Sequence, residues 1–393
     1  MERLTANQHE LFHFNVILLV LADWMQGSLL FQNALFIVEI LKYTALASGM
    51  LAFYLEYRSG LKQTEMIRLC FIVLLAFMTC IKTQNMSYLL IVLIIVTAKN
   101  ININDFIKTD LRVSVACAAI QVFAWVLNCF VSLGFPVYEN VIEHRIGFLY
   151  VHPNMAAMKL GWMIIMWLWL RWDIVKKKDY FIAVIITSVL YYATKSDGCL
   201  LIYIFIFLMA LKKNTFVRKT IVFSGKFVFF FLGIVSWGLS VCYMGYGKIT
   251  RISQQLDLFF SRRFAMSYLA IKENGITLTG QSISLRHERG GGGALFWFGD
   301  YTIDSLYTYL FISVGVIWFL IISVGFYKLL HKENYKYAVA VVVFSLYATI
   351  ELHCIFLPKC FVLLLLKNCL FDESKSKETN NLQNCLQGVK YDT

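Results

Sequence analysis

A short polar stretch ahead of an apolar run carries residues suited to binding an anionic group. Arg145 is followed by His152, Pro153 and Asn154, and the apolar run begins directly afterwards. Because proline is favoured in the first turn of a helix, His152 is expected at a helix N-cap. The N–H groups and positive end of such a helix attract anions. Lys159 lies seven residues after His152, on nearly the same face about two turns deeper.

This set of residues has a functional interpretation and a structural one. A helix N-terminus, a histidine, an arginine and a half-buried lysine would together form a pocket for pyrophosphate. The alternative is a proline-initiated helix whose interfacial polar side chains extend toward water. Ionisable residues inside a membrane are functional by default but interfacial ones are not, so the spacing leaves both interpretations open.

A second set of basic residues lies in a long polar loop over residues 245–305. Seven cations occur there: Lys248, Arg251, Arg262, Arg263, Lys272, Arg286 and Arg289. Membrane proteins usually keep Lys and Arg on the cytoplasmic side, so arginines in a translocated loop indicate a function. The guanidinium group suits phosphate or carboxylate. The mixture of Arg262 and Arg263 with aromatic residues between Gln254 and Lys272 also fits an amphipathic helix lying on lipid headgroups.

Acidic residues complete the candidate site. Asp300 and Asp304 precede an apolar run; they would bind a cation or an arginine if a helix began early. We prefer the simpler interpretation of acids favoured at a helix N-terminus. Glu351, near the outer end of another apolar run, is costly to bury unless it meets an arginine or lines a wet cavity. Glu39 and Lys42 are predicted to form a structural pair.

Membrane-spanning helices must position these residues. The chain has 393 residues, of which 59% are hydrophobic and 15% charged, a composition foreign to a soluble domain of this length. We predict an all-α polytopic membrane protein with about 12 transmembrane helices. The transmembrane domain covers residues 1–371, with its large external loop between spans nine and ten, and a polar tail covers residues 372–393. Expected spans centre on 12–31, 33–55, 67–81, 86–98, 113–133, 155–171, 180–194, 198–211, 221–243, 306–327, 337–356 and 358–371.

Charge gives the orientation and excludes several functions. Most of the net charge of +12 lies in short loops, which indicates topology rather than nucleic-acid binding. Basic-rich and basic-poor loops alternate, which places both termini in the cytoplasm and loops 134–154 and 245–305 outside. The sequence contains no P-loop, no Asp-x-Asp, no GxSxG, no HExxH and no Cys/His cluster with zinc-ligand spacing. We therefore expect neither a metal nor a cofactor.

Four segments, in order, resemble motifs of the Wzy-type oligosaccharide repeat-unit polymerases of capsule, exopolysaccharide and O-antigen assembly. The O-antigen ligases carry a looser version of the first motif. The four segments are Arg145-x-Gly147-Phe148 with His152-Pro153-Asn154; Phe260-Ser261-Arg262-Arg263-Phe264 with Gly275-Ile276-Thr277-Leu278 and Gly280-Gln281; Ile303-Asp304-Ser305-Leu306-Tyr307 with Val314-Gly315-Val316-Ile317; and Glu351 ahead of Pro358. Together they cover roughly residues 135–366. Arg263 is a better match than Arg262 to the arginine of the family.

The resemblance implies a GT-C-like glycosyltransferase in the bacterial cytoplasmic membrane. Its donor would be a glycan on undecaprenyl pyrophosphate, and its acceptor another lipid-linked repeat unit at the outer leaflet. A hydroxyl of the acceptor would attack the anomeric carbon with inversion, and the lipid pyrophosphate would leave. Arginines stabilise such a leaving group without a metal. A flippase and a chain-length regulator are further expected partners, and nucleic acid is not.

The resemblance also implies roles for individual residues. Arg145 and Arg263 would bind the pyrophosphate, with Arg262, Lys159, Arg251 and Asn154 contributing to substrate binding. His152 would be a proton acceptor or a phosphate ligand. Asp304 and Glu351 would orient arginines or the acceptor sugar.

Two other functions compete with polymerisation. A ligase would transfer the finished glycan to a different acceptor, and sequence separates the two activities poorly. A flippase or solute transporter would suit twelve spans and intramembrane charges, but such proteins typically show repeats and broken helices, and the sequence predicts neither. A membrane sensor or scaffold is the least favoured interpretation.

Overall fold

The computed structural model describes residues 2–58, 62–132, 139–140, 145–245, 255, 257–258, 263–283 and 303–371. The regular elements of this part of the chain are helices except for one two-residue strand pair, in which β1 (Glu139–Asn140) runs antiparallel to β2 (Arg145–Ile146), and an isolated bridge between Ser28 and Tyr150. The prediction of an all-α protein is therefore confirmed for the described residues.

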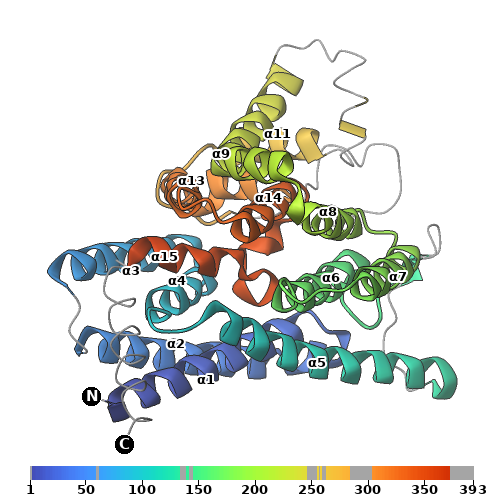
Figure 1. Cartoon of the computed structure of the whole chain (residues 1–393), viewed down its shortest axis with the longest axis horizontal. Helices are drawn as coiled ribbons and strands as arrows, with labels where there is room; N and C mark the ends of the chain where they lie inside the picture. The colour runs from blue at the N-terminus through green and yellow to red at the C-terminus, as the bar shows by residue number, and fades with distance from the viewer. Residues whose placement is uncertain are drawn as a thin grey trace, which may run out of the picture.

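The helices pack in groups that follow the chain order (Figure 1). α1 (Glu2–Gln26) packs on α2 (Leu35–Arg58) and α5 (Ile103–Val131), and α3 (Gln63–Thr83) lies against α4 (Ser87–Thr97). α6 (Pro153–Leu170) contacts α7 (Lys177–Thr194) and α8 (Gly198–Ala210). α9 (Thr215–Gly245) packs on α11 (Arg263–Asn274), α13 (Val316–Leu330) and α14 (Tyr335–Ile350).

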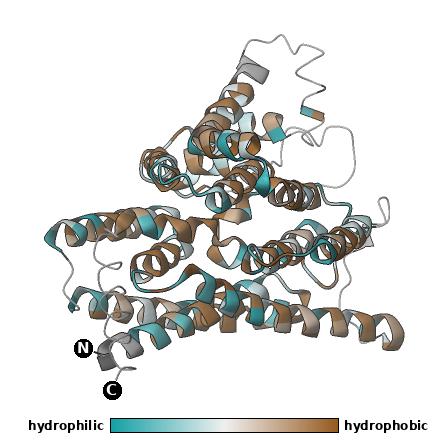
Figure 2. Ribbon diagram, viewed as in Figure 1, coloured by the Kyte–Doolittle hydropathy of each residue, from teal (hydrophilic) through white to brown (hydrophobic). Residues whose placement is uncertain are grey.

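Four helices in the described ranges are long and apolar enough to cross a membrane. They span Leu29–Arg58, Gln63–Thr83, Ile103–Val131 and Thr215–Val241. Figure 2 shows hydrophobic residues along their length. Large apolar side chains point outward from them: Phe71 is 60% exposed, Phe130 84% and Phe216 77%. A water-soluble protein does not expose apolar surface on this scale, so these faces fit a lipid environment.

The other expected spans are shorter or interrupted, so the count of twelve is not confirmed. α4 has 11 residues, which reach about 16 Å, against a hydrocarbon core of about 30 Å. The other short apolar helices are Val316–Leu330, Tyr335–Ile350 and Phe361–Leu370.

The expected span over residues 306–327 is broken in its middle. α12 (Leu306–Tyr309) continues into the π turn η3 (Leu310–Val314), and α13 begins only after Gly315. The segment after α11 fills the break: the Thr277 N–H donates to Phe311 O, and the Val316 N–H donates to Thr277 O, each at 2.9 Å. Backbone groups freed by the interruption therefore find partners within the protein, as the membrane interior requires.

A glycine is required at this crossing, and its replacement gives a testable prediction. Gly315 has φ +117°, and a Cβ there would lie 2.4 Å from Leu278 O. We expect Gly315→Ala to lower the stability in detergent by about 1–3 kcal/mol or more, from strain and the clash. Gly238→Ala is the control, because no atom lies within 4 Å of its Cβ position and alanine favours a helix. Equal melting temperatures for the two variants would contradict the docked crossing.

The end of the described chain is also irregular. After α14, three 3₁₀ turns follow, η4 (Leu352–Ile355), η5 (Leu357–Lys359) and η6 (Phe361–Leu366), before the one-turn helix α15 (Lys367–Leu370). The Lys367 ammonium donates to Ala98 O at 2.8 Å and to Ile101 O. This irregular segment is therefore anchored to the carbonyls that follow α4.

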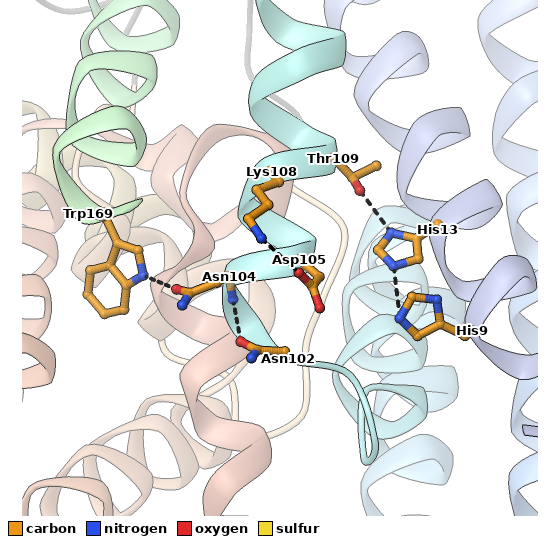
Figure 3. A network of polar contacts seen from close by, with 8 residues as sticks. All are labelled: His9, His13, Asn102, Asn104, Asp105, Lys108, Thr109 and Trp169. Carbon is orange, nitrogen blue, oxygen red and sulfur yellow. Dashed lines mark hydrogen bonds and ion pairs between the residues drawn. The ribbon is translucent and has the colours of Figure 1, made fainter. Parts of the chain in front are cut away.

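Polar contacts fix α5 against α1 and α6 (Figure 3). His13 Nδ1 lies 2.9 Å from Thr109 Oγ1, and Trp169 Nε1 donates to Asn104 Oδ1 at 3.0 Å. Asn102 caps α5, because its side chain accepts a hydrogen bond from the Asn104 N–H at 2.9 Å. These bonds set the position of α6, whose other end carries the first candidate residues.

Candidate functional site

The start of α6 has the predicted capping geometry. His152 is the N-cap, with φ −148° and ψ 143°, and Pro153 occupies the first turn. The His152 Nδ1 accepts a hydrogen bond from the Asn154 N–H at 3.1 Å. A neutral imidazole that accepts at Nδ1 carries its proton on Nε2. In this arrangement His152 offers an N–H donor, which suits a phosphate ligand better than a proton acceptor.

Arg145 is held between α6 and the end of α7. Its Nε donates to Thr194 O at 2.8 Å, and its Nη2 donates to Asn154 Oδ1. The structure thus brings together three predicted residues, Arg145, His152 and Asn154. A helix C-terminal carbonyl is a favourable partner for an arginine, so part of the contact is structural.

Lys159 has partners that the sequence analysis missed. Its Nζ lies 3.0 Å from Asp23 Oδ2 and donates to Asp23 O at 2.8 Å. The Nζ of Lys359 lies 3.2 Å from Asp23 Oδ1. The side chains of Lys159 and Lys359 are only 10% and 6% exposed. We call Asp23, Lys159 and Lys359 the lysine–aspartate cluster.

A cavity of about 320 Å³ opens beside this cluster. Its wall combines residues of α1, α2, α4, α6 and α12 with Asn85, which follows α3, and with the segment after α14. The polar side chains in the wall are Asp23, Gln26, Lys42, Asn85, Ser87, Tyr309, His353 and Lys359. Val151 and Met155 also line it, so the cavity reaches the turn that carries His152.

Arg263 begins α11 and faces an acid. Its Nε lies 3.7 Å from Asp304 Oδ2, and the Arg263 side chain is 13% exposed. Asp304 therefore accompanies an arginine, although the helix does not begin early: Ser305 takes the N-cap of α12, and Asp304 lies directly before it. The expected pair of Glu39 and Lys42 is confirmed, with 3.1 Å between Nζ and Oε1.

The surroundings of Arg263 are rich in hydroxyl groups. A cavity of about 90 Å³ is lined by Arg263 together with Ser236, Ser267, Ser305 and Thr349. The first N–H groups of α11 are not open to a ligand: Asp257 Oδ1 accepts from the Phe264 and Ala265 N–H groups at 2.9 and 3.1 Å. An anion at this place would therefore be bound by the Arg263 side chain rather than by the helix N-terminus.

α11 forms part of the amphipathic helix expected between Gln254 and Lys272. It packs on α9, and Ser267 accepts a hydrogen bond from Thr308 Oγ1 at 2.8 Å. One face of this amphipathic helix therefore packs against the rest of the protein.

Two titratable residues after α14 have altered pKa values. Burial, and secondly the negative charge of Asp304, raises the pKa of Glu351 to about 7. The positive charge of Lys359, together with burial, lowers the pKa of His353 to about 3. Near neutral pH, Glu351 thus exchanges a proton readily, whereas His353 is uncharged.

The segment from Glu351 to Lys359 connects the two arginine groups. Arg263 and Asp304 both act electrostatically on Glu351, and Lys359 shares the wall of the large cavity with Val151 and Met155. Glu351 thus lies near Arg263 and Asp304, and Lys359 lies in the cavity wall close to the turn that carries His152.

Three of the predicted residues lie in parts of the chain that the structure does not describe, and four site residues were not predicted. Arg251, Arg262 and Asp300 lie outside the described residues. The site residues that were not predicted from the sequence are Asp23, Lys359, His353 and Asp257. Asp23 and Lys359 carry a usable signal, since each is a charge within an apolar run, and intramembrane charges are functional candidates.

The described residues offer no evident metal centre. In these ranges, no group of three or more His, Cys, Asp or Glu side chains is placed to hold a metal ion. Arginine and lysine side chains are the groups available there for an anion.

Known proteins supply no match for this chain. No protein-family model, curated protein or solved structure is significantly similar to it. A functional assignment therefore depends on the geometry of the site and on the motifs in the sequence.

Proposed function

We propose that this protein is a membrane glycosyltransferase that polymerises lipid-linked oligosaccharide repeat units, as the resemblance to the Wzy-type polymerases implies. The observation that carries the proposal is the grouping of the motif residues: Arg145, His152 and Asn154 meet at the start of α6, and Arg263 meets Asp304 next to Glu351. The two groups are more than a hundred positions apart in the sequence.

The proposed reaction needs stabilisation of a departing pyrophosphate. The acceptor hydroxyl oxygen bonds to the anomeric carbon of the donor, and the bond from that carbon to the lipid pyrophosphate oxygen breaks. Arg145, Arg263 and the Nε2–H of His152 would offer hydrogen bonds to the negative charge that develops. The proposal places the protein in the bacterial cytoplasmic membrane, with about twelve spans, a GT-C-like fold and the site at the outer leaflet.

The hydroxyl proton requires an acceptor, and Glu351 has the appropriate pKa. A general base works best with a pKa near the working pH, and the pKa of Glu351 is about 7. His152 is less suited, because its Nδ1 already accepts the Asn154 N–H. Glu351 is thus assigned to proton acceptance, with Asp304 orienting Arg263.

This assignment predicts a pH dependence. Below pH 7 Glu351 is protonated and cannot accept a proton, and above pH 7 it is ionised, so kcat should rise as the pH passes through about 7. Glu351→Gln should lower kcat by about 100-fold and remove the inflection. Initial rates from pH 5.5 to 8.5 check this. An inflection that persists in Glu351→Gln would assign the proton to another group.

The direct test of the proposed function uses the full chain in liposomes with one lipid-linked repeat unit as the sole substrate. A ladder of dimers, trimers and longer chains on a gel is the expected result. Transfer only to an added second acceptor would identify a ligase. No glycan product from folded protein given its native repeat unit would overturn the proposal.

One observation favours the alternative of a transporter. The break at Gly315 and the irregular segment after α14 are interrupted helices beside a cavity, which secondary transporters use for substrate sites and which the sequence did not predict. Movement of the lipid-linked unit between leaflets without new glycosidic bonds would support transport. A ladder without such movement would exclude it.

A further inference from the structure

The lysine–aspartate cluster has an excess of positive charge. Asp23 is the shared partner of Lys159 and Lys359, so one carboxylate balances two ammonium groups. Asp110 on α5 acts electrostatically on Asp23 and Lys159, but it does not line the cavity. Its carboxyl group accepts a hydrogen bond from Ser114 Oγ at 2.9 Å, and among the described residues it forms no ion pair with Lys159 or Lys359.

A buried excess of positive charge is expected to be balanced by a bound anion. Buried charges are normally paired, because their removal from water is costly. Lys42, another cation in the cavity wall, forms an ion pair with Glu39, and the Glu39 side chain is 54% exposed. On the side of the cavity that Lys359 lines, two ammonium groups therefore share one carboxylate in ion pairs, and Glu351 adds an electrostatic interaction with Lys359 but no ion pair to it among the described residues.

The rest of the wall is suited to a ligand with hydroxyl groups. Gln26, Asn85, Ser87 and Tyr309 offer amide and hydroxyl groups, which both donate and accept hydrogen bonds. Phe356 adds an aromatic ring, over which Lys359 Nζ lies at 5.3 Å from the centroid. Most other side chains of the wall, such as Leu19, Leu90 and Leu352, are apolar, as in most ligand sites, where a few polar groups fix the orientation of the ligand.

An unpartnered group also points to a missing ligand. His353 lines the cavity, and its Nδ1 is buried without a hydrogen-bond partner among the described residues. Because native proteins pair most buried polar atoms, a ligand or an ordered water is expected to satisfy it. A volume of about 320 Å³ is at the small end of ligand sites, which fits one sugar residue better than an oligosaccharide.

We propose that the cavity beside Asp23, Lys359 and His353 binds an acidic sugar residue, one that carries a carboxylate or phosphate. Lys359 pairs with the acid group, and Gln26, Asn85 and Ser87 bind hydroxyls. The identification of the ligand as part of a repeat unit rests on the proposed function, but the affinity for an acidic sugar does not. The cavity would then select repeat units by charge, separately from the arginines that bind the lipid pyrophosphate.

The test measures binding without turnover. Saturation-transfer NMR on the purified full chain compares glucuronate, its neutral counterpart glucose, and inorganic phosphate. Glucuronate should bind at least about tenfold more tightly than glucose, as expected for a charge-assisted hydrogen bond. Lys359→Met should remove this preference and Lys359→Arg should retain it, whereas Asn85→Leu should weaken both sugars.

Each other outcome overturns a named part of the proposal. Equal affinity for glucose and glucuronate, or an unchanged preference in folded Lys359→Met, would eliminate the acid-binding role of Lys359. Phosphate binding as tight as glucuronate, with no effect of Asn85→Leu, would identify a bare phosphate group such as a lipid headgroup. If Lys359→Met does not fold, Lys359→Gln replaces it, because it also removes the charge but keeps a polar side chain, and it should weaken glucuronate alone.

The failure of this inference is distinguishable from failure of the proposed function. A polymer ladder from a neutral repeat unit, with no glucuronate binding, would uphold the polymerase and overturn the acidic-sugar site. Glucuronate binding without any ladder would do the reverse.

Discussion

Replacing Arg263 with alanine should slow chain lengthening about 100- to 1,000-fold, the usual cost of removing one donor that stabilises developing negative charge. Arg263 is 13% exposed and lies 3.7 Å from Asp304, so its guanidinium is positioned before any ligand binds. Arg263→Lys should recover only part of the rate, because an ammonium group cannot form two parallel hydrogen bonds to a phosphate. Initial rates in liposomes at saturating repeat unit measure the effect.

A matched arginine separates chemistry from folding. Arg171 caps the other end of α6 and pairs with Asp179 at 3.2 Å, so Arg171→Ala also removes an arginine and an ion pair. The Asp179 carboxylate keeps its hydrogen bond from the Lys176 N–H at 2.8 Å in this variant, so chain lengthening should be nearly unchanged. If Arg171→Ala slowed the reaction as much as Arg263→Ala, the loss would reflect general damage rather than a role for Arg263.

Removing Asp23 should be among the most destabilising single changes in the protein. Asp23→Asn would leave Lys159 and Lys359 buried without their shared carboxylate, and breaking a buried ion pair in this way costs about 3–5 kcal/mol. Lys359→Met should cost much less, because Asp23 and Lys159 still pair at 3.0 Å. Thermal unfolding in detergent compares the two.

A double variant checks the difference expected between Asp23→Asn and Lys359→Met. Adding Lys359→Met to Asp23→Asn removes one of the two unpaired charges, so the double variant should be more stable than Asp23→Asn alone. If the losses of stability of the two single variants simply add in the double variant, then the charges of Asp23, Lys159 and Lys359 do not interact as one group.

Local features of the site were predictable from the sequence. Proline after His152 predicted the helix start, and the N-cap was found there. The spacing of Glu39 and Lys42 predicted their ion pair, which was also found. In both cases the contacts lie within one turn of a helix, where a periodicity of 3.6 residues determines which side chains meet.

The interrupted helices were not predictable in the same way. Hydropathy treats residues 306–327 as one apolar run, and the glycine that ends η3 is a single residue within it. Gly315 has φ +117°, and a Cβ there would lie 2.4 Å from Leu278 O and 2.9 Å from Thr279 Cα. Those residues come from a loop about 35 positions earlier, so the break depends on a long-range contact that periodicity does not contain.

The lysine–aspartate cluster also depends on long-range contacts and was not predictable from the sequence. Asp23, Lys159 and Lys359 are each a single charge in an apolar run, and their separations in sequence exceed a hundred residues. Reading Lys159 with its neighbours in sequence assigned it to a pyrophosphate pocket at the start of α6. The approach of α6 to α1 instead joins it to Asp23, and the packing of α1 on η5 adds Lys359.

The measurement that tests the central claim most directly is equilibrium binding of undecaprenyl pyrophosphate to the purified protein, compared with undecaprenyl monophosphate. If Arg145 and Arg263 bind the leaving group, the wild type should prefer the pyrophosphate by about tenfold or more, since each charged hydrogen bond contributes about 1.5–3 kcal/mol. Arg145→Ala and Arg263→Ala should each reduce that preference, and Arg171→Ala should leave it unchanged. Equal affinity for the two lipids, or an unchanged preference in folded Arg145→Ala and Arg263→Ala, would contradict the account.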